Sequence, residues 1–309
     1  MELHSISGRS RLGLALALLS SFLWGAFPIF LKLASQGIDI YTITWFRLVG
    51  AFALLTVYLL WRKQFPSRQN WRDILWGLVG IACLFLLGNY LLFLIGLRQT
   101  SPGNAQLCFQ FSTLFFAGGG MLIFREHYTP RQWLGVAVMI LGFTLFFHEQ
   151  LRILIQAQWQ YIIASGLIIL SSASWAVYAL AQKQLLQKLP SPTILLMVYG
   201  ISGFLLTPLA TPRSLFSLSP PVGMALLFCT LNTVLAYGAF GEAMAHLEVS
   251  KISAILAVNP IITLVLVTSL SFIFPMIFHP ETLTFLAILG AVLVVIGSMT
   301  ISLGKSKKG

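Results

Sequence analysis

Long apolar segments follow one another along almost the whole chain, and short polar or charged stretches separate them. A helix needs about 20 apolar residues to cross the hydrocarbon core of a bilayer. Runs of this length predict ten membrane helices, at residues 12–35, 40–61, 73–97, 103–124, 131–148, 159–186, 192–209, 221–247, 250–274 and 283–303. We therefore expect an all-α membrane protein rather than a membrane β-barrel, which would show alternating segments of about ten residues.

Composition and charge agree with this pattern. Hydrophobic residues make up 58% of the chain and charged residues 9%, and the mean hydropathy is +0.89, whereas a soluble domain is about a quarter charged. The net charge of +11 could indicate nucleic acid, but the basic residues lie in loops between apolar segments. Most of the 19 Lys and Arg fall on the side that holds both termini. This bias predicts a multi-pass protein of the cytoplasmic membrane with both termini in the cytoplasm and no nucleic-acid partner.

Two pairs of segments indicate an internal duplication. Leu19–Lys32 and Leu170–Lys183 share Leu, Ser, Ser, Trp and Lys at matching places. A second set, Glu126, Thr129, Gly135 and Gly142, recurs with the same spacing as Glu281, Thr284, Gly290 and Gly297. The halves are predicted at 12–148 and 159–303, and five helices in each make the second half inverted. Such inverted repeats are common in secondary transporters, which hold the substrate near mid-membrane between the halves.

Polar and aromatic residues gather on single faces of the predicted helices. At 100° per residue, one stripe spans about 120° and consists of Ser20, Ser21, Trp24, Pro28 and Lys32. Its counterpart spans about 100° and consists of Ser171, Ser174, Trp175, Tyr178 and Gln182. Tyr90 and Tyr237 also occupy matching places in the two halves. As a set, Trp24, Tyr90, Trp175, Tyr178 and Tyr237 favour a cavity for a moderately apolar substrate such as an amino acid, although any one of them could serve packing alone.

Neutral amides are further candidates for substrate binding. Gln106 and Gln110 share one face of the fourth predicted helix. Asn259 precedes Pro260, which cannot donate to the carbonyl of Leu256 and so leaves an acceptor for a ligand, a water or a side chain. Such groups hydrogen-bond polar ligands without a buried charge, but they also join helices to one another.

Arg47 and Glu242 are the candidate charges for coupling or gating. Arg47 stands about two turns inside its helix, where a charge costs about 2.5–3.5 kcal/mol. It could contact substrate or a gating partner, form a structural pair, or reach the membrane surface. Glu242 shares a helix face with Asn232, a candidate binding residue, and with His246. It could tune substrate choice or exchange a proton during transport, or it could pair with His246 or Lys251.

Several motifs resemble the EamA-type members of the drug/metabolite transporter superfamily. They are WGAFPIFLK at 24–32, WFR at 45–47, REHYTPRQWLG at 125–135 and PETLTFLAILG at 280–290. The resemblance extends from about residue 12 to 303 and departs at FPMIFHP, 274–280. It implies two inverted five-helix repeats, a cavity lined by helices 1, 3, 4, 6, 8 and 9, and helices 5 and 10 at the periphery. It also implies carriage of small metabolites or amino acids, often outward, without nucleotide hydrolysis.

These observations predict a secondary-active exporter of a small metabolite that works by alternating access, as a monomer or a homodimer. No cofactor or metal is expected, because the five histidines are scattered and the three cysteines lie within apolar segments. A flippase for lipids or lipid-linked headgroups on the same scaffold is one alternative. A multi-pass membrane enzyme is another, but the sequence has no HExxH motif and no paired carboxylates.

Overall fold

The computed structural model describes residues 9–65, 75–124, 129–154, 159–186, 188–246, 255–278 and 284–303. Within these ranges the regular structure is entirely helical. The helices are α1 (Ser10–Ala34), α2 (Ile40–Trp61), α4 (Trp76–Gln99), α5 (Pro102–Phe109), α6 (Phe111–Phe124), α7 (Pro130–Leu154), α8 (Trp159–Leu185), α9 (Ser191–Leu206), α10 (Pro220–His246), α12 (Asn259–Ile273) and α13 (Phe285–Leu303), with two short 3₁₀ helices, η1 (Thr207–Leu209) and η2 (Pro212–Ser217).

Six helices of the described chain are long and apolar enough to cross a membrane: α1, α2, α4, α8, α9 together with η1, and α10. Pro130–Phe146, Asn259–Ile273 and Phe285–Ile301 are shorter apolar helical segments. The all-α membrane class expected from the sequence is therefore confirmed. Glu126, Glu281 and Lys251, which entered the sequence argument, lie outside the described residues.

Three of the predicted helices differ from the structure by a break or by more than three residues. The helix expected at 103–124 is broken at Gln110 into α5 and α6, although neither proline nor glycine stands at the break. In the helix expected at 250–274, a turn at 257–258 precedes α12, because Pro260 lacks the backbone N–H that would continue it. The helix expected to end at 148 continues to Leu154, so residues 149–154 extend α7.

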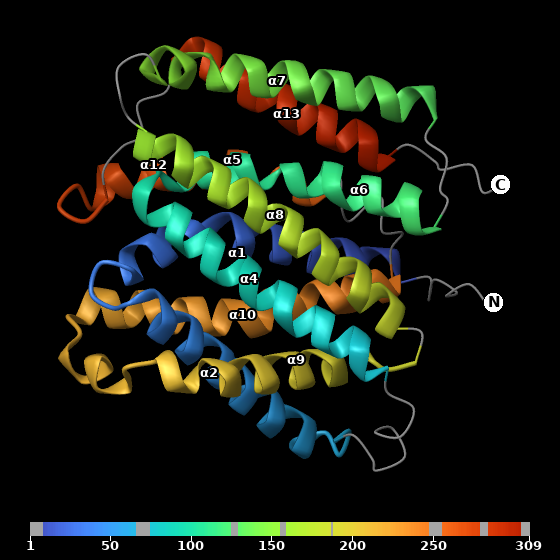
Figure 1. Cartoon of the computed structure of the whole chain (residues 1–309), viewed down its shortest axis with the longest axis vertical. Coiled ribbons are helices and arrows are strands. Elements are labelled where there is room, and N and C mark those ends of the chain that lie inside the picture. The colour runs from blue at the N-terminus through green and yellow to red at the C-terminus, as the bar shows by residue number, and fades with distance from the viewer. Residues whose placement is uncertain are drawn as a thin grey trace.

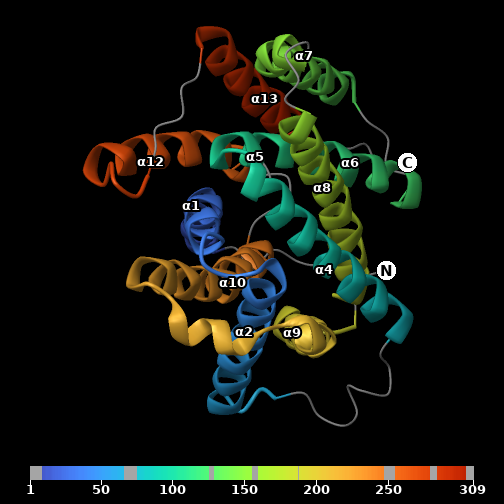
Figure 2. The same cartoon turned by 60° about the vertical axis from the view of Figure 1, so that its left-hand side comes forward.

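Helices α7 and α13 pack against each other at one edge of the molecule, and α2 and α9 pack at the opposite edge (Figures 1 and 2). In the α7–α13 pair, a Cβ added to Gly135 would lie 2.9 Å from the carbonyl oxygen of Gly297. A Cβ added to Gly142 would lie 2.8 Å from that of Gly290. The two helices are therefore antiparallel, and their backbones touch at glycines because a larger residue would separate them.

The space between these edges is occupied by α1, α4, α5, α8, α10 and α12. Helix α1 packs on α10 and α12, and α4 packs on α8, while α5 contacts both α8 and α12. The first described helix begins and the last one ends at the same end of the bundle (Figure 1). At the other end, a buried apolar cluster that includes Leu31, Leu97 and Leu226 fills the space between α1, α4 and α10. Near the middle of the bundle, this packing leaves a cavity.

Candidate functional site

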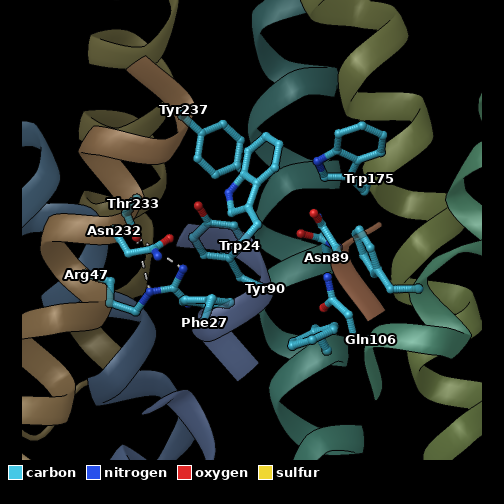
Figure 3. Close-up of a pocket in the computed structure, with 13 residues that line it drawn as sticks. Trp24, Phe27, Arg47, Asn89, Tyr90, Gln106, Trp175, Asn232, Thr233 and Tyr237 are labelled. Carbon is cyan, nitrogen blue, oxygen red and sulfur yellow. Dashed lines mark hydrogen bonds between the residues drawn. The ribbon is translucent and has the colours of Figure 1, made fainter. Parts of the chain in front are cut away.

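A cavity lies at the centre of the bundle, among α1, α2, α4, α5, α8, α10 and α12 (Figure 3). It is lined by Trp24, Phe27, Arg47, Asn89, Tyr90, Phe93, Gln106, Phe109, Trp175, Asn232, Thr233, Tyr237 and Asn259. The space open to the centres of water-sized molecules is about 90 Å³. Since roughly 10–15 Å³ of such space holds one water, the cavity has room for several waters or one small solute.

Arg47 is fixed at the cavity by one hydroxyl and two aromatic rings. It is only 3% exposed, and its Nε and Nη2 donate to Thr233 Oγ1 at 3.3 and 3.2 Å. Its guanidinium carbon lies over the rings of Phe27 and Tyr90, 4.5 and 4.4 Å from their centroids (Figure 3). A structural ion pair was one of the alternatives for Arg47, and no such pair is present among the described residues. The cation is instead held by neutral groups, with part of the guanidinium turned to the cavity.

The amides of Asn89 and Asn232 are anchored to neighbouring helices through their nitrogens. Asn89 Nδ2 donates to the carbonyl and the hydroxyl of Ser171 at 3.0 and 2.8 Å, which ties α4 to α8. Asn232 Nδ2 donates to the carbonyl of Leu23 at 2.6 Å, which ties α10 to α1. Neither Oδ1 accepts a hydrogen bond from another described residue, so both oxygens remain acceptors for a ligand or for water.

Asn259 satisfies the acceptor that Pro260 leaves behind. In the amide orientation that satisfies both its nitrogen and its oxygen, the nitrogen donates to the carbonyl of Leu256 at 3.1 Å and to that of Ser21 at 3.2 Å. One turn further along α12, the hydroxyl of Thr263 donates to the carbonyl of Gly25 at 2.6 Å. Of the ligand, water or side chain that could pair with the Leu256 carbonyl, the partner is therefore the side chain of Asn259. The same side chain joins α12 to α1 beside the cavity.

Aromatic side chains form much of the cavity wall. Trp24 packs against Tyr237 with an interplanar angle of 77° and a centroid distance of 5.1 Å. On the opposite wall, Phe109 contacts Trp175 at 6.0 Å and Phe93 at 5.6 Å, both edge to face. These rings present apolar surface, with the indole and phenol groups as polar edges, and they suit a ligand with an apolar body.

The structure brings together most of the residues that the sequence singled out. Trp24, Arg47, Tyr90, Gln106, Trp175, Asn232, Tyr237 and Asn259 all line the cavity. Gln110, Tyr178 and Glu242 do not. The Gln110 amide donates to the carbonyl of Ala257 at 3.2 Å, and Tyr178 is buried in the apolar cluster between α2, α4, α8 and α9. Glu242 is 63% exposed and lies 3.3 Å from His246 Nε2, which is the pairing that the sequence left open.

Five lining residues were missed by sequence reasoning: Phe27, Asn89, Phe93, Phe109 and Thr233. Asn89 directly precedes Tyr90 and Thr233 directly follows Asn232, so a polar stripe one residue wider would have included them. The three phenylalanines carry no such signal, because an apolar residue in a membrane helix faces lipid, protein or a cavity equally well.

The lining residues have one charge and several neutral hydrogen-bonding groups. No Asp, Glu, His or Cys is among them, and the described residues contain no cluster of His, Cys, Asp and Glu able to hold a metal ion. What the arrangement can do is bind a small molecule reversibly at the centre of a membrane bundle. Fold and cavity together define a multi-pass helical membrane protein with a central cavity of a size for a small molecule.

The profile of the EamA-like transporter family matches this chain twice, at residues 11–148 and 162–303. The chain belongs to this family, which is of the drug/metabolite transporter type. The resemblance seen in the sequence motifs is thereby confirmed. Family and relatives indicate a transporter rather than an enzyme, located in the cell membrane.

Similar proteins carry transporter names. "Uncharacterized inner membrane transporter YhbE" of Escherichia coli (strain K12) is 33% identical over 298 residues, which cover 95% of this chain and 92% of that protein. The "Probable amino-acid metabolite efflux pump" of Salmonella typhimurium is 25% identical over 235 residues, covering 71% and 74%. A solved chain described as "Crystal structure of protein" matches with a TM-score of 0.64 at 14% identity, over 95% of this chain and 98% of its own, which shows the fold alone.

Proposed function

We propose that this protein is a secondary carrier that moves a small, moderately apolar metabolite, such as an amino acid, across the cytoplasmic membrane by alternating access. The observation that carries the proposal is the central cavity, whose lining comes from helices of both halves of the chain. A site between two halves can be exposed to either side in turn when one half rocks against the other. Export is the favoured direction, because the Salmonella relative is named as an efflux pump.

The proposed architecture is ten helices in two inverted repeats, 12–148 and 159–303, with both termini in the cytoplasm. Two observations support it. The helices at the ends of the proposed repeats, α7 and α13, pack antiparallel through Gly135 and Gly142 against Gly297 and Gly290. Exchanging the two proposed halves replaces α1 by α8 and α10 by α4, so the packed pair α1–α10 becomes the packed pair α8–α4. A two-fold axis in the membrane plane requires this relationship.

One end of the bundle has contacts suited to a closed gate. Where α1 ends and α2 begins, Asp39 Oδ2 accepts from the hydroxyl of Thr211 at 2.8 Å, and the Thr211 N–H donates to Thr42 Oγ1 at 2.7 Å. The rings of Phe30 and Phe228 meet at 4.3 Å. These contacts join the two proposed halves on the side opposite the termini. We propose that they break when the carrier opens outward.

Glu242 has a different proposed role from the cavity residues. Its exposure and its position beside His246 support a role in coupling or gating rather than in the binding step. Glu242 is thus a proposed coupling group outside the cavity lining, whereas Arg47 is the charge that faces the bound solute.

The test is binding and exchange by the purified protein. Thermal stability is measured against amino acids and related metabolites, and each hit is followed as exchange of labelled compound in proteoliposomes. A ligand at 100 times its Kd, bound only by the native state, stabilises it by about 2.7 kcal/mol. Stabilisation by a solute that is then exchanged supports the carrier. Stabilisation by lipid headgroups alone, with no exchange of solute, supports a flippase instead.

A further inference from the structure

The cavity carries a single charge with no countercharge beside it. Arg47 is the one charged residue among those that line the cavity, and an arginine side chain stays protonated in proteins. It is 3% exposed and sits within a membrane-compatible helix. A partner of opposite charge strongly stabilises a buried charge of this kind. The described residues of the protein supply no such partner.

The hydrogen bonds of Arg47 leave part of the guanidinium unused. A guanidinium has about five N–H donors in one plane. Two of its nitrogens, Nε and Nη2, donate to Thr233 Oγ1, and that hydroxyl in turn donates to the carbonyl of Cys229 at 2.8 Å. Thr233 is therefore an oriented acceptor that holds one edge of the group, while the Nη1 edge has no acceptor among the described residues.

The two aromatic rings restrict how a partner can approach. Phe27 and Tyr90 each lie within 4.5 Å of the guanidinium carbon (Figure 3). Rings over a guanidinium cover its two faces and leave its edges accessible. A ligand therefore approaches the cation in the plane of its N–H groups. In-plane approach to two parallel N–H donors is the geometry by which arginine binds a carboxylate.

We infer that Arg47 binds a carboxylate of the transported molecule, so that the substrates are small organic acids with one carboxylate on an apolar body. This inference rests on the proposed carrier function. The aromatic walls made by Trp24, Phe109 and Trp175 receive the apolar body. An amino group on the ligand meets the neutral oxygens of Asn89 and Asn232, with no acidic side chain in the lining. The carboxylate is therefore required, and the amino group is dispensable.

The experiment compares matched ligands on the full-length wild-type protein. Three skeletons, those of alanine, leucine and phenylalanine, are each tested as the amino acid, as the 2-hydroxy acid without the amino group, and as the amino amide without the carboxylate. Thermal stabilisation and inhibition of exchange in proteoliposomes are measured for all nine. For any skeleton that fits, both acids should bind and the amide should bind roughly 10- to 100-fold more weakly, as expected for a lost charged hydrogen bond.

A pair of variants tests the residue itself. Arg47→Gln should weaken binding of the acids by roughly 10- to 100-fold and leave the amides within about twofold of wild type. Arg131→Gln removes an exposed charge at the start of peripheral helix α7 and should change neither. If Arg47→Gln does not fold, the comparison of acids with amides on the wild-type protein still decides the question.

The outcomes separate the two proposals. Amides that bind and compete as well as the acids would overturn the carboxylate inference and leave the carrier intact. The carboxylate inference is equally overturned if Arg47→Gln weakens acids and amides to the same extent, since the effect would then be structural. Absence of binding and exchange for all nine compounds would instead contradict the carrier of small, moderately apolar metabolites itself.

Discussion

The side-chain amide of Gln110 donates to the backbone carbonyl of Ala257 at 3.2 Å. Gln110 stands between α5 and α6, and Ala257 stands in the turn that precedes α12. Two helix interruptions that are far apart in the sequence therefore meet beside the cavity. Interrupted helices leave backbone groups without intrahelical partners, and here one interruption supplies the donor for the other.

Gln110→Leu should lower the stability of the protein. The substitution removes the donor and leaves the buried carbonyl of Ala257 unpaired, which costs about 1–3 kcal/mol. The measurement is the midpoint of thermal unfolding in detergent, followed by tryptophan fluorescence. Thr144→Ala is the control, because Thr144 is exposed and bonds only the carbonyl of Ile140 in its own helix. Equal midpoints for Gln110→Leu and the control would contradict this role for Gln110.

Gly142→Ala should separate α7 from α13. The new methyl group would meet the nitrogen of Val294 at 2.6 Å and the carbonyl oxygen of Gly290 at 2.8 Å, and such overpacking costs about 1–3 kcal/mol. Gly80→Ala is the matched control, because a Cβ at Gly80 meets nothing within 4 Å. In that open helical position alanine is favoured over glycine by roughly 0.5–1 kcal/mol. Thermal unfolding should move in opposite directions for the two variants.

Acid should loosen the end of the bundle that contains Asp39. Partial burial raises the pKa of Asp39, but hydrogen bonds from Thr42, Thr211 and Tyr41 outweigh it, and the pKa lies below its ordinary value. A lowered pKa means that the carboxylate contributes stability above its unfolded pKa, and that this stability is lost as the pH falls through the folded pKa.

The measurement for Asp39 is thermal stability between about pH 6 and pH 3, because the ordinary pKa of aspartate is about 3.9. Wild type should lose more stability than Asp39→Asn below about pH 4, since the variant has no carboxylate to protonate. Parallel curves for the two proteins would show that Asp39 does not carry the acid sensitivity.

Trp175→Ala should weaken binding of ligands with an apolar body. It removes one wall of the cavity, where the indole meets Phe109, and the loss of a buried aromatic contact of this size is worth about 1–3 kcal/mol. Trp175→Phe should restore most of the affinity. Trp61→Ala, at the exposed end of α2, is the control and should leave the Kd unchanged. The Kd of each hit in the ligand panel is measured for all three variants.

Glu242→Gln should separate binding from coupling. Because Glu242 lies outside the cavity lining and is exposed, ligand affinity should stay within about twofold of wild type. The pH dependence of exchange in proteoliposomes should flatten, since the variant lacks the carboxylate beside His246. Transport with an unchanged pH profile would remove Glu242 from any coupling role.

The sequence determined the membrane class, most helix boundaries and the family, because long apolar runs and loop charges record the constraints of the bilayer directly. It also identified eight of the residues that line the cavity, since polar groups in membrane helices avoid lipid and share a face. Arg47 was recognisable as a costly charge, but its three alternatives could not be separated along a single helix.

Only the tertiary structure decided which partner each group meets. It placed the hydroxyl of Thr233, from α10, and two rings from α1 and α4 around Arg47. It moved Gln110 out of the cavity lining by breaking its helix, and it placed Tyr178 in an apolar cluster. Helical periodicity fixes only the direction in which a side chain points around the axis of its own helix. How the helices are tilted and packed against one another decides whether a polar stripe faces a neighbour or an open space.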